Sequence, residues 1–185
     1  LDGGARPNPG AAGSGMIVRW DNADGKPLRH IRAFQGIGET SNNAAELYAM
    51  LMLQQHLLTF QPPIPSTTPI LILSDSQLTI NFLTYKSAPS PTLNHPLIHA
   101  ARNGHDALCD RFRYVKLLYS PAHVGIFLNE EADKLATKGV KASQAGRGHN
   151  EAEMARRIHQ NDFSIPRHNI RDLTTLHYRT YLHHH

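Results

Sequence analysis

Residues 120–133 read Ser-Pro-Ala-His-Val-Gly-Ile-Phe-Leu-Asn-Glu-Glu-Ala-Asp, which is the pattern of a loop followed by the start of a helix. Asn129 has a typical N-cap side chain, and the residues after it favour helix as far as Ala136, so the pattern predicts a helix that Asn129 opens. Asp133 then lies about one turn into this helix, and His123 lies on the loop before it. Because an acidic first turn also suits the helix dipole, Asp133 alone does not indicate a site.

The composition indicates one core-forming domain with a mild excess of positive charge. The 185 residues are 40% hydrophobic, and 19 Lys and Arg stand against 15 Asp and Glu, a formal net charge of +4 that suits a polyanionic partner. Cys109 is the single cysteine, which excludes an intrachain disulfide and favours an intracellular, reducing compartment. No apolar run approaches the ~20 residues that span a bilayer.

The first 69 residues predict three strands and a long helix. Leu1 to Gly4 read as the end of a strand, and we expect further residues upstream of them. Alternating side chains predict strands over residues 14–20 and 28–35, joined by a short turn that makes them antiparallel. Apolar residues at helical spacing predict a helix over residues 43–60, which the proline-rich loop of residues 61–69 ends.

The remaining residues predict alternating strands and helices and then a different kind of segment. Residues 70–73 are continuously apolar, which predicts a strand covered on both faces. A helix after Gln77, a helix over residues 99–110 and a strand over residues 114–119 complete an α/β fold with a mixed sheet. Residues 141–149 have the composition of a linker, and residues 151–160 and 170–182 predict helices. We therefore expect a domain over residues 1–140 and a linker with a helical C-terminal extension over residues 141–185.

Four acidic residues are predicted at the ends of elements: Asp2, Glu46, Asp75 and Asp133. Each has a structural alternative, since Asp2 suits a turn, Glu46 suits a capping box with Asn43, and Asp75 suits the cap of the next helix. If the fold brings the four together, their repulsion requires a bound counter-charge. Two Mg²⁺ ions with oxygen ligands would balance the four negative charges.

Four blocks of the sequence closely resemble the signature blocks of type I ribonuclease H. The blocks are Asp2-Gly3-Gly4 with Asn8-Pro9-Gly10 and Gly13, Thr40-Ser-Asn-Asn-Ala-Ala-Glu46-Leu, Ser74-Asp75-Ser76-Gln77, and His123-Val-Gly125 with Asn129-Glu-Glu-Ala-Asp133. They occur in the family's order across about residues 1–140. The resemblance implies a ribonuclease H-like fold with a five-stranded mixed sheet in the order 3-2-1-4-5, and hydrolysis of the RNA strand of an RNA/DNA hybrid.

The resemblance also implies roles for the acidic residues. Two Mg²⁺ ions about 4 Å apart, or Mn²⁺ as a substitute, would flank the scissile phosphate and leave 5′-phosphate and 3′-hydroxyl ends. By the family pattern Asp2 bridges the metals, Glu46 and Asp75 help to hold one of them, and Asp133 holds the other. His123 on its loop assists proton transfer or product departure.

Substrate selection requires groups that sense the 2′-hydroxyl of RNA, and side-chain amides can both donate and accept hydrogen bonds. Ser41 matches a position that contacts a DNA-strand phosphate. The predicted substrate-binding residues are Asn8, Ser41, Asn42, Asn43, Gln77 and Asn129.

The chain departs from the family in two places. Glu39 is acidic near the phosphate side, and residues 85–103 lack the Trp and Lys cluster that several members use to hold the hybrid. We therefore expect weak, salt-sensitive hybrid binding. Basic residues of the C-terminal extension are candidates to compensate, namely Arg156, Arg157, Arg167 and Arg171.

Two other functions stay open. A ribonuclease H-like domain can serve as a catalytically silent nucleic-acid-binding or structural module, but such a module would have no reason to keep four repelling acids. A related integrase or resolvase would cleave DNA, and the Asn-Asn-x-x-Glu and His-x-Gly blocks argue against it. The expected partners are an RNA/DNA hybrid and a larger polypeptide, such as the reverse transcriptase of a retroelement.

Overall fold

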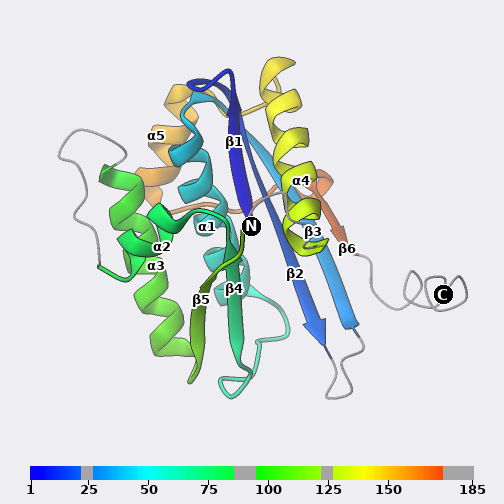
Figure 1. Cartoon of the computed structure of the whole chain (residues 1–185), viewed down its shortest axis with the longest axis vertical. Coiled ribbons are helices and arrows are strands. Elements are labelled where there is room, and N and C mark those ends of the chain that lie inside the picture. The colour runs from blue at the N-terminus through cyan, green and yellow to red at the C-terminus, as the bar shows by residue number, and fades with distance from the viewer. Residues whose placement is uncertain (22–26, 86–94, 122–126, 173–185) are drawn as a thin grey trace, which may run out of the picture.

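The structure is a computed structural model that describes residues 1–21, 27–85, 95–121 and 127–172. Its strands are β1 (Asp2–Arg6), β2 (Gly10–Asp21), β3 (Pro27–Thr40), β4 (Ile70–Ser74), β5 (Val115–Tyr119) and β6 (Ile170–Asp172). Its helices are α1 (Asn42–Thr59), α2 (Gln77–Leu83), α3 (His95–Arg111), α4 (Phe127–Gln144) and α5 (Glu151–Gln160), with a 3-10 turn η1 (Arg167–Asn169). The predicted α/β class is confirmed (Figure 1).

The described strands form two hydrogen-bonded groups, so the predicted single sheet in the order 3-2-1-4-5 needs correction. β1, β2, β3 and β6 form an antiparallel sheet in that order, and β4 pairs with β5 in parallel. β1 begins close to where β4 ends (Figure 1), so the two strands overlap too little to form a ladder. Their link is a hydrogen bond of 3.2 Å from the amino group of Leu1 to the carbonyl oxygen of Leu73.

An apolar groove of about 340 Å³ lies between residues 17–20 of β2 and residues 70–73 of β4. Leu71 lines this groove and is 59% exposed. The prediction that residues 70–73 are covered on both faces is therefore wrong. Alternate residues of β4 point to opposite faces, and only the face that carries Ile70 and Ile72 is buried.

Helices α1 and α4 cover opposite faces of the antiparallel sheet. The hydroxyl of Ser14 in β2 donates to the carbonyl oxygen of Ala45 in α1, at 2.7 Å. Gly13 and Gly15, on either side of Ser14, point the other way, toward α4, because side chains alternate along a strand. A Cβ atom at Gly13 would overlap the α4 backbone at Ala136, so only glycine allows α4 to lie this close to the sheet.

Helix α1 forms the centre of the core, between the sheet and α3. Its buried side chains lie all around its axis rather than on one stripe, as expected of a helix covered on every side. The ring of Tyr48 is fully buried and lies 5.7 Å from the ring of Phe163, which is itself 2% exposed. The segment after α5 therefore packs into the same core as residues 1–140.

The structure corrects two sequence predictions for the second half of the chain. Helix α4 continues to Gln144, so residues 141–144 are helical and not part of a linker. Residues 170–172 form β6, which pairs with β3 from Ile31↔Asp172 to Ala33↔Ile170, where a helix was predicted. Residues 173–182 of that predicted helix lie outside the described residues. Within the described part of the chain, no helix is long and apolar enough to cross a membrane.

Candidate active site

Three of the four predicted carboxylates come together at one point of the structure. Asp2 opens β1, Glu46 lies in the second turn of α1, and Asp75 directly follows β4. One carboxylate oxygen from each lies within 4.8 Å of the others. Asp2 and Glu46 are each 7% exposed, and Asp75 is half-buried. We call these three residues, together with Asp133, the carboxylate cluster.

The close approach of β1 to α1 holds Asp2 and Glu46 together. A Cβ atom at Gly3 would overlap the backbone of Ala45 and Glu46, so glycine is required there. The backbone N–H of Gly3 also donates to Asp2 Oδ1 at 2.9 Å and to Glu46 Oε1 at 3.1 Å. Gly3 was predicted only as part of a signature block, and its role as the residue that fixes both carboxylates was missed.

The cluster is electrostatically unfavourable on its own. Burial raises the pKa of Asp2 to about 6, and the neighbouring Asp75 and Asp133 add to this rise while a hydrogen bond with Glu46 opposes it. Burial also raises the pKa of Glu46 well above its usual range, and Asp2 and Asp75 raise it further. Asp2 and Glu46 therefore titrate as a pair, and without a counter-charge both carboxyls hold a proton more tightly than an ordinary carboxyl does.

Asp133 approaches the cluster from α4. It lies near enough to Asp2 to raise its pKa through a hydrogen bond and through charge repulsion. Each carboxylate of the cluster thus comes from a different element, namely β1, α1, the end of β4 and α4. His123, the predicted proton-transfer residue, lies outside the described residues.

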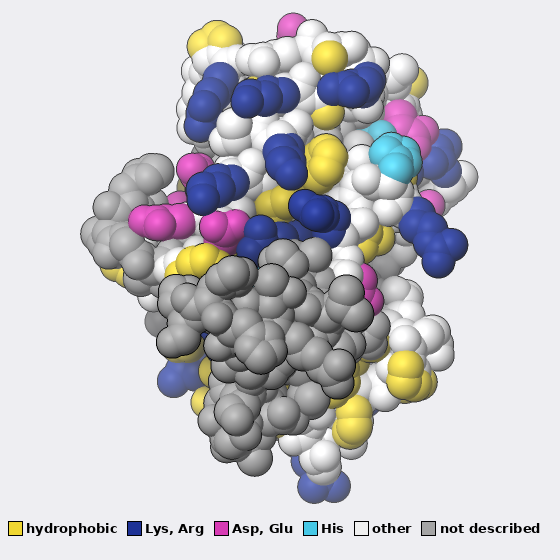
Figure 2. Space-filling view, turned by 90° about the vertical axis from the view of Figure 1, so that its right-hand side faces the viewer, with side chains coloured by type: hydrophobic (Ala, Val, Ile, Leu, Met, Phe, Trp, Pro, Cys, Tyr) yellow, Lys and Arg dark blue, Asp and Glu magenta, His cyan; other side chains and the backbone are white. Residues whose placement is uncertain are grey.

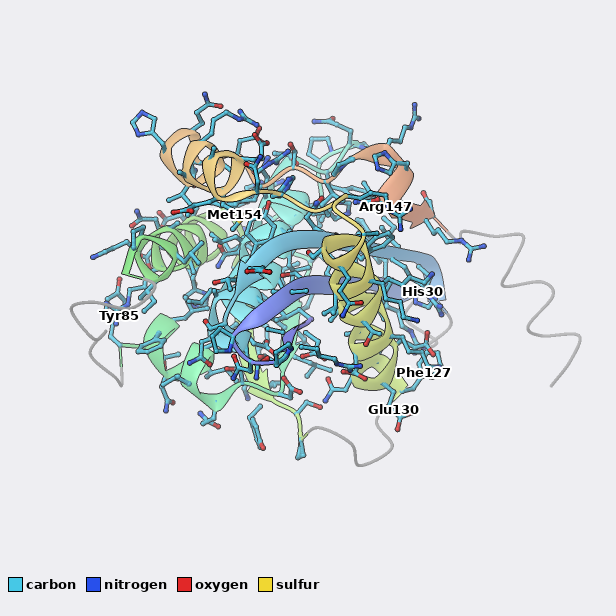
Figure 3. The ribbon with its side chains drawn as sticks, turned by 90° about the horizontal axis from the view of Figure 1, so that it is seen from above. His30, Tyr85, Phe127, Glu130, Arg147 and Met154 are labelled. Atoms are coloured by element: carbon cyan, nitrogen blue, oxygen red, sulfur yellow. The ribbon has the colours of Figure 1, made fainter. Side chains whose placement is uncertain are left out.

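Asn129 does not cap α4, because the helix begins two residues earlier, at Phe127. Its side chain is 9% exposed, and its Nδ2 donates to the carbonyl oxygen of Ser120 at 2.9 Å, to Ser120 Oγ at 2.7 Å and to the carbonyl oxygen of Pro121 at 3.2 Å. These bonds tie the end of β5 to the first turn of α4. Figure 3 shows Phe127 and Glu130 at this end of α4, with Arg147 beyond the other end. Asn129 therefore positions the helix that carries Asp133, and its assignment to substrate binding stays a prediction.

Serines occupy the cap positions that the structural alternatives gave to other residues. Ser41 caps α1 by accepting from the N–H of Ala44 at 3.2 Å, and Ser76 caps α2 by accepting from the N–H of Thr79 at 3.2 Å. The capping box of Asn43 with Glu46 and the cap by Asp75 are therefore wrong. Neither carboxylate is explained by helix capping.

The predicted amide residues lie at or near the starts of α1 and α2. Asn42 Oδ1 accepts from the N–H of Ala5 at 2.7 Å, and the N–H of Asn42 donates to Asn8 Oδ1 at 3.0 Å. Asn43 is exposed in the first turn of α1, and Gln77 is exposed and donates to Asn81 Oδ1 at 2.9 Å. Asn42 and Asn43 lie in the first turn of α1, one turn before Glu46, and Asn8 is hydrogen-bonded to Asn42, while Gln77 lies two residues after Asp75.

The cluster fits divalent metal ions. Glu46 Oε2 is buried and has no hydrogen-bond partner within the described residues, which is costly for a carboxylate oxygen unless a cation contacts it. All the ligand atoms are carboxylate oxygens, the type that Mg²⁺ and Mn²⁺ prefer. Asp2, Glu46 and Asp75 would hold one ion, and Asp2 with Asp133 would hold a second.

Comparison with known proteins gives the family. The family model described as RNase H matches residues 1–141. A ribonuclease H of Mycolicibacterium smegmatis is 32% identical over 156 residues, which cover 76% of this chain and 84% of that protein. A ribonuclease H of Methylorubrum extorquens is 29% identical over 161 residues, and the match spans 82% of this chain but only 63% of that protein. The chain belongs to the RNase H family.

Solved structures agree with this assignment. The N-terminal RNase H domain of rv2228c from Mycobacterium tuberculosis superposes with a TM-score of 0.60 and 27% identity, over 78% of this chain and 93% of that one. LC11-RNase H1, solved in complex with an RNA/DNA hybrid, superposes with a TM-score of 0.55 and 25% identity, over 75% and 95% of the two chains. The ribonuclease H-like fold is confirmed.

Proposed function

We propose that the protein is an endoribonuclease that hydrolyses the RNA strand of RNA/DNA hybrids with two divalent metal ions. The observation that carries this proposal is the carboxylate cluster itself, with three acidic oxygens within 4.8 Å and one buried Glu46 oxygen without a partner among the described residues. The family match and the hybrid-bound neighbour support the choice of substrate.

The chain's own residues would position the substrate and hold the metal ions. When bound, Mg²⁺ supplies a nucleophile from water at neutral pH and stabilises the leaving oxygen, so that 5′-phosphate and 3′-hydroxyl ends form. Gly3 fixes Asp2 and Glu46 in place before any substrate arrives, and Asn129 fixes the start of the helix that carries Asp133. Such preorganised side chains need little rearrangement during the reaction.

Discrimination of RNA from DNA is assigned to the amides next to Glu46. Asn42 Nδ2, Asn43 and Asn8 lie at the start of α1 and can contact a 2′-hydroxyl, while Ser41 is in part committed to the helix cap. Proton transfer by His123, an intracellular location and association with a larger polypeptide such as a reverse transcriptase stay predictions.

Cleavage of a strand-labelled RNA/DNA hybrid tests the proposal. Label on the RNA strand should appear in fragments with 5′-phosphate ends when Mg²⁺ is present, and cleavage should stop in EDTA. RNA/RNA and DNA/DNA duplexes of the same sequence are the controls and should remain intact. Cleavage of the DNA strand, or RNA cleavage that persists in EDTA, would overturn the proposal.

A further inference from the structure

A second charged surface lies on the other side of α4 from β1. A groove of about 270 Å³ runs between α4, β3 and the η1–β6 segment. Four basic side chains line it, and we call this surface the basic groove: Arg32, Lys134, Lys138 and Arg171. Figure 2 views this side of the molecule and shows Lys and Arg side chains gathered on it.

Like charges are placed opposite one another in the basic groove. Arg32 of β3 and Arg171 of β6 are direct partners across the two strands, an arrangement that costs stability when both residues are charged. Lys134 and Lys138 are four residues apart on α4 and repel each other in the same way. The fold therefore holds four positive charges together.

One carboxylate only partly offsets this charge. Glu131 lies 3.0 Å from Arg32 and 3.2 Å from Lys134, in two ion pairs. Within the described residues, Lys138 and Arg171 have no carboxylate partner, and the Lys134 side chain is 71% exposed. The groove thus presents an uncompensated positive charge to solvent, along one turn of helix and one short strand.

The other basic residues predicted to compensate for weak binding are placed differently. Arg156 and Arg157 both pair with Glu153, at 2.6 and 2.9 Å. Arg157 is also 9% exposed and donates to the carbonyl oxygens of Asp162 and Ser164. These two arginines hold the end of α5 together. Of the four residues predicted to compensate, Arg171 is the one that lines the basic groove with the α4 lysines.

We infer that the basic groove binds the phosphate backbone of the RNA/DNA hybrid outside the cleavage site. The same helix carries Asp133 toward β1 and Lys134 and Lys138 toward β3, so the two surfaces are separated by about one helix diameter, roughly 10 Å. A duplex rises about 3.4 Å per base pair, so a hybrid that occupies the carboxylate cluster has further phosphates within that range. Several fixed positive charges along a groove suit a chain of phosphates better than a single anion.

The test compares two double variants with the same change of charge. Lys138→Gln with Arg171→Gln removes two charges from the groove, and Arg113→Gln with Lys116→Gln removes two exposed charges around the start of β5. Equilibrium binding of a hybrid of about 24 base pairs, roughly 80 Å long, is measured against salt with Mg²⁺ present. All proteins carry Asp75→Asn to prevent cleavage.

The groove variant should show a salt slope that is smaller by about 2 units, because each phosphate contact contributes about 0.9. The control variant should keep the parent slope, and in proteins with Asp75 the groove variant should raise KM while kcat is unchanged. Equal slopes for all three proteins would overturn the inference. If the groove variant does not fold, chemical acetylation of Lys138 in the parent protein is measured with and without bound hybrid instead. Slower acetylation with hybrid supports the inference, and unchanged acetylation overturns it.

This inference rests on the proposed function, because its test uses the proposed substrate, but each of the two can be refuted without the other. Equal salt slopes with normal RNA cleavage would refute the proposed role of the groove and leave the proposed nuclease function standing. No cleavage by the unaltered protein, together with a smaller slope for the groove variant, would refute the nuclease function and support the groove as a nucleic-acid-binding surface.

Discussion

The carboxylate cluster and the basic groove lie on two sides of the same helix, and they hold like charges in opposite ways. The cluster buries Asp2 and Glu46 at 7% exposure, whereas Lys134 in the groove is 71% exposed. Water and salt screen the groove, but they do not screen the cluster to the same degree. Loss of a charge should therefore alter catalysis strongly at the cluster, and mainly salt-dependent binding at the groove.

The largest effect is expected from Asp75→Asn. This change removes one ligand from the cluster and should lower the rate of hybrid cleavage by at least about 10²-fold, the loss typical of removing one preorganised electrostatic group. Without metal the fold should be as stable as before or slightly more stable, because one repelling charge is gone. Asp106→Asn, at an exposed position of α3, is the matched control and should cleave normally. Normal turnover by the Asp75 variant would refute the assignment of the metal site.

A smaller effect on the cleavage rate, together with a loss of stability, is expected from Asn129→Ala. The change leaves the carbonyl oxygens of Ser120 and Pro121 without their donor and should lower the free energy of unfolding by about 1–3 kcal/mol. Because it loosens the end of α4 that carries Asp133, the cleavage rate should fall while the salt slope for hybrid binding stays unchanged. Asn103→Ala, on the exposed side of α3, is the control for chemical denaturation. Equal stability of the two variants would show that the buried amide does not anchor α4.

The pKa of Asp2 makes the metal-free protein lose stability as pH rises. Its pKa is about 6 in the folded state against 3.8 for the ordinary carboxyl, so the folded state binds the proton more tightly. Stability linked to this proton is fully present below about pH 3.8 and is lost between there and about pH 6. Asp2→Asn should remove this dependence, so the unfolding free energy of the variant minus that of the parent should increase over this range in EDTA. A difference that stays constant with pH would contradict the buried, mutually repelling site.

The smallest effect on stability is expected in the basic groove. Lys138→Gln changes an exposed side chain without a carboxylate partner in the described residues, so the free energy of unfolding should change by less than about 0.5 kcal/mol. Urea denaturation at low and at high salt measures this change. A loss above 1 kcal/mol would show that Lys138 supports the fold, and it would weaken the contrast between the two surfaces.

The carboxylates Glu46 and Asp75 were predictable because each lies near the start or end of an element that the sequence marks clearly. β4 is a short apolar run, and α1 has a long helical pattern after Ser41. The prediction that residues 1–4 are the end of a strand is wrong, because Asp2 opens β1 and the strand continues through both glycines to Arg6. The strand and helix patterns do not predict how close the three carboxylates lie to one another. The signature blocks predicted that they come together, and the close contact between Gly3 and Ala45 is the structural reason.

The errors come from features that only tertiary packing decides. Residues 141–149 have the composition of a linker, but residues 141–144 continue α4. Gly139 lies within this helix, where a Cβ atom would approach the carbonyl oxygen of Gln35. Close packing on the sheet therefore explains this glycine. Residues 170–172 carry no strong strand pattern and become β6 because the edge of β3 offers hydrogen-bonding partners.

Two further errors share a cause, which is that a local pattern does not reveal what lies next to it. Asn129 looks like an N-cap, but the helix starts at Phe127, and the Asn129 amide donates instead to the carbonyl oxygen of Ser120, directly after β5. Residues 70–73 look fully covered, yet Leu71 faces the open groove between β4 and β2. In both cases the sequence predicted the element, and the neighbouring element determined the role of the residue.

Thermal unfolding with and without Mg²⁺ tests the central claim most directly, because a repelling cluster must gain stability when cations bind. A metal concentration of 100 times the dissociation constant should stabilise the unaltered protein by about 2.7 kcal/mol, which is several degrees in Tm for a chain of this length. The double variant Asp2→Asn, Asp133→Asn should shift little under the same conditions, because it keeps only Glu46 and Asp75. Equal shifts for the two proteins would place the metal ions elsewhere and contradict the account.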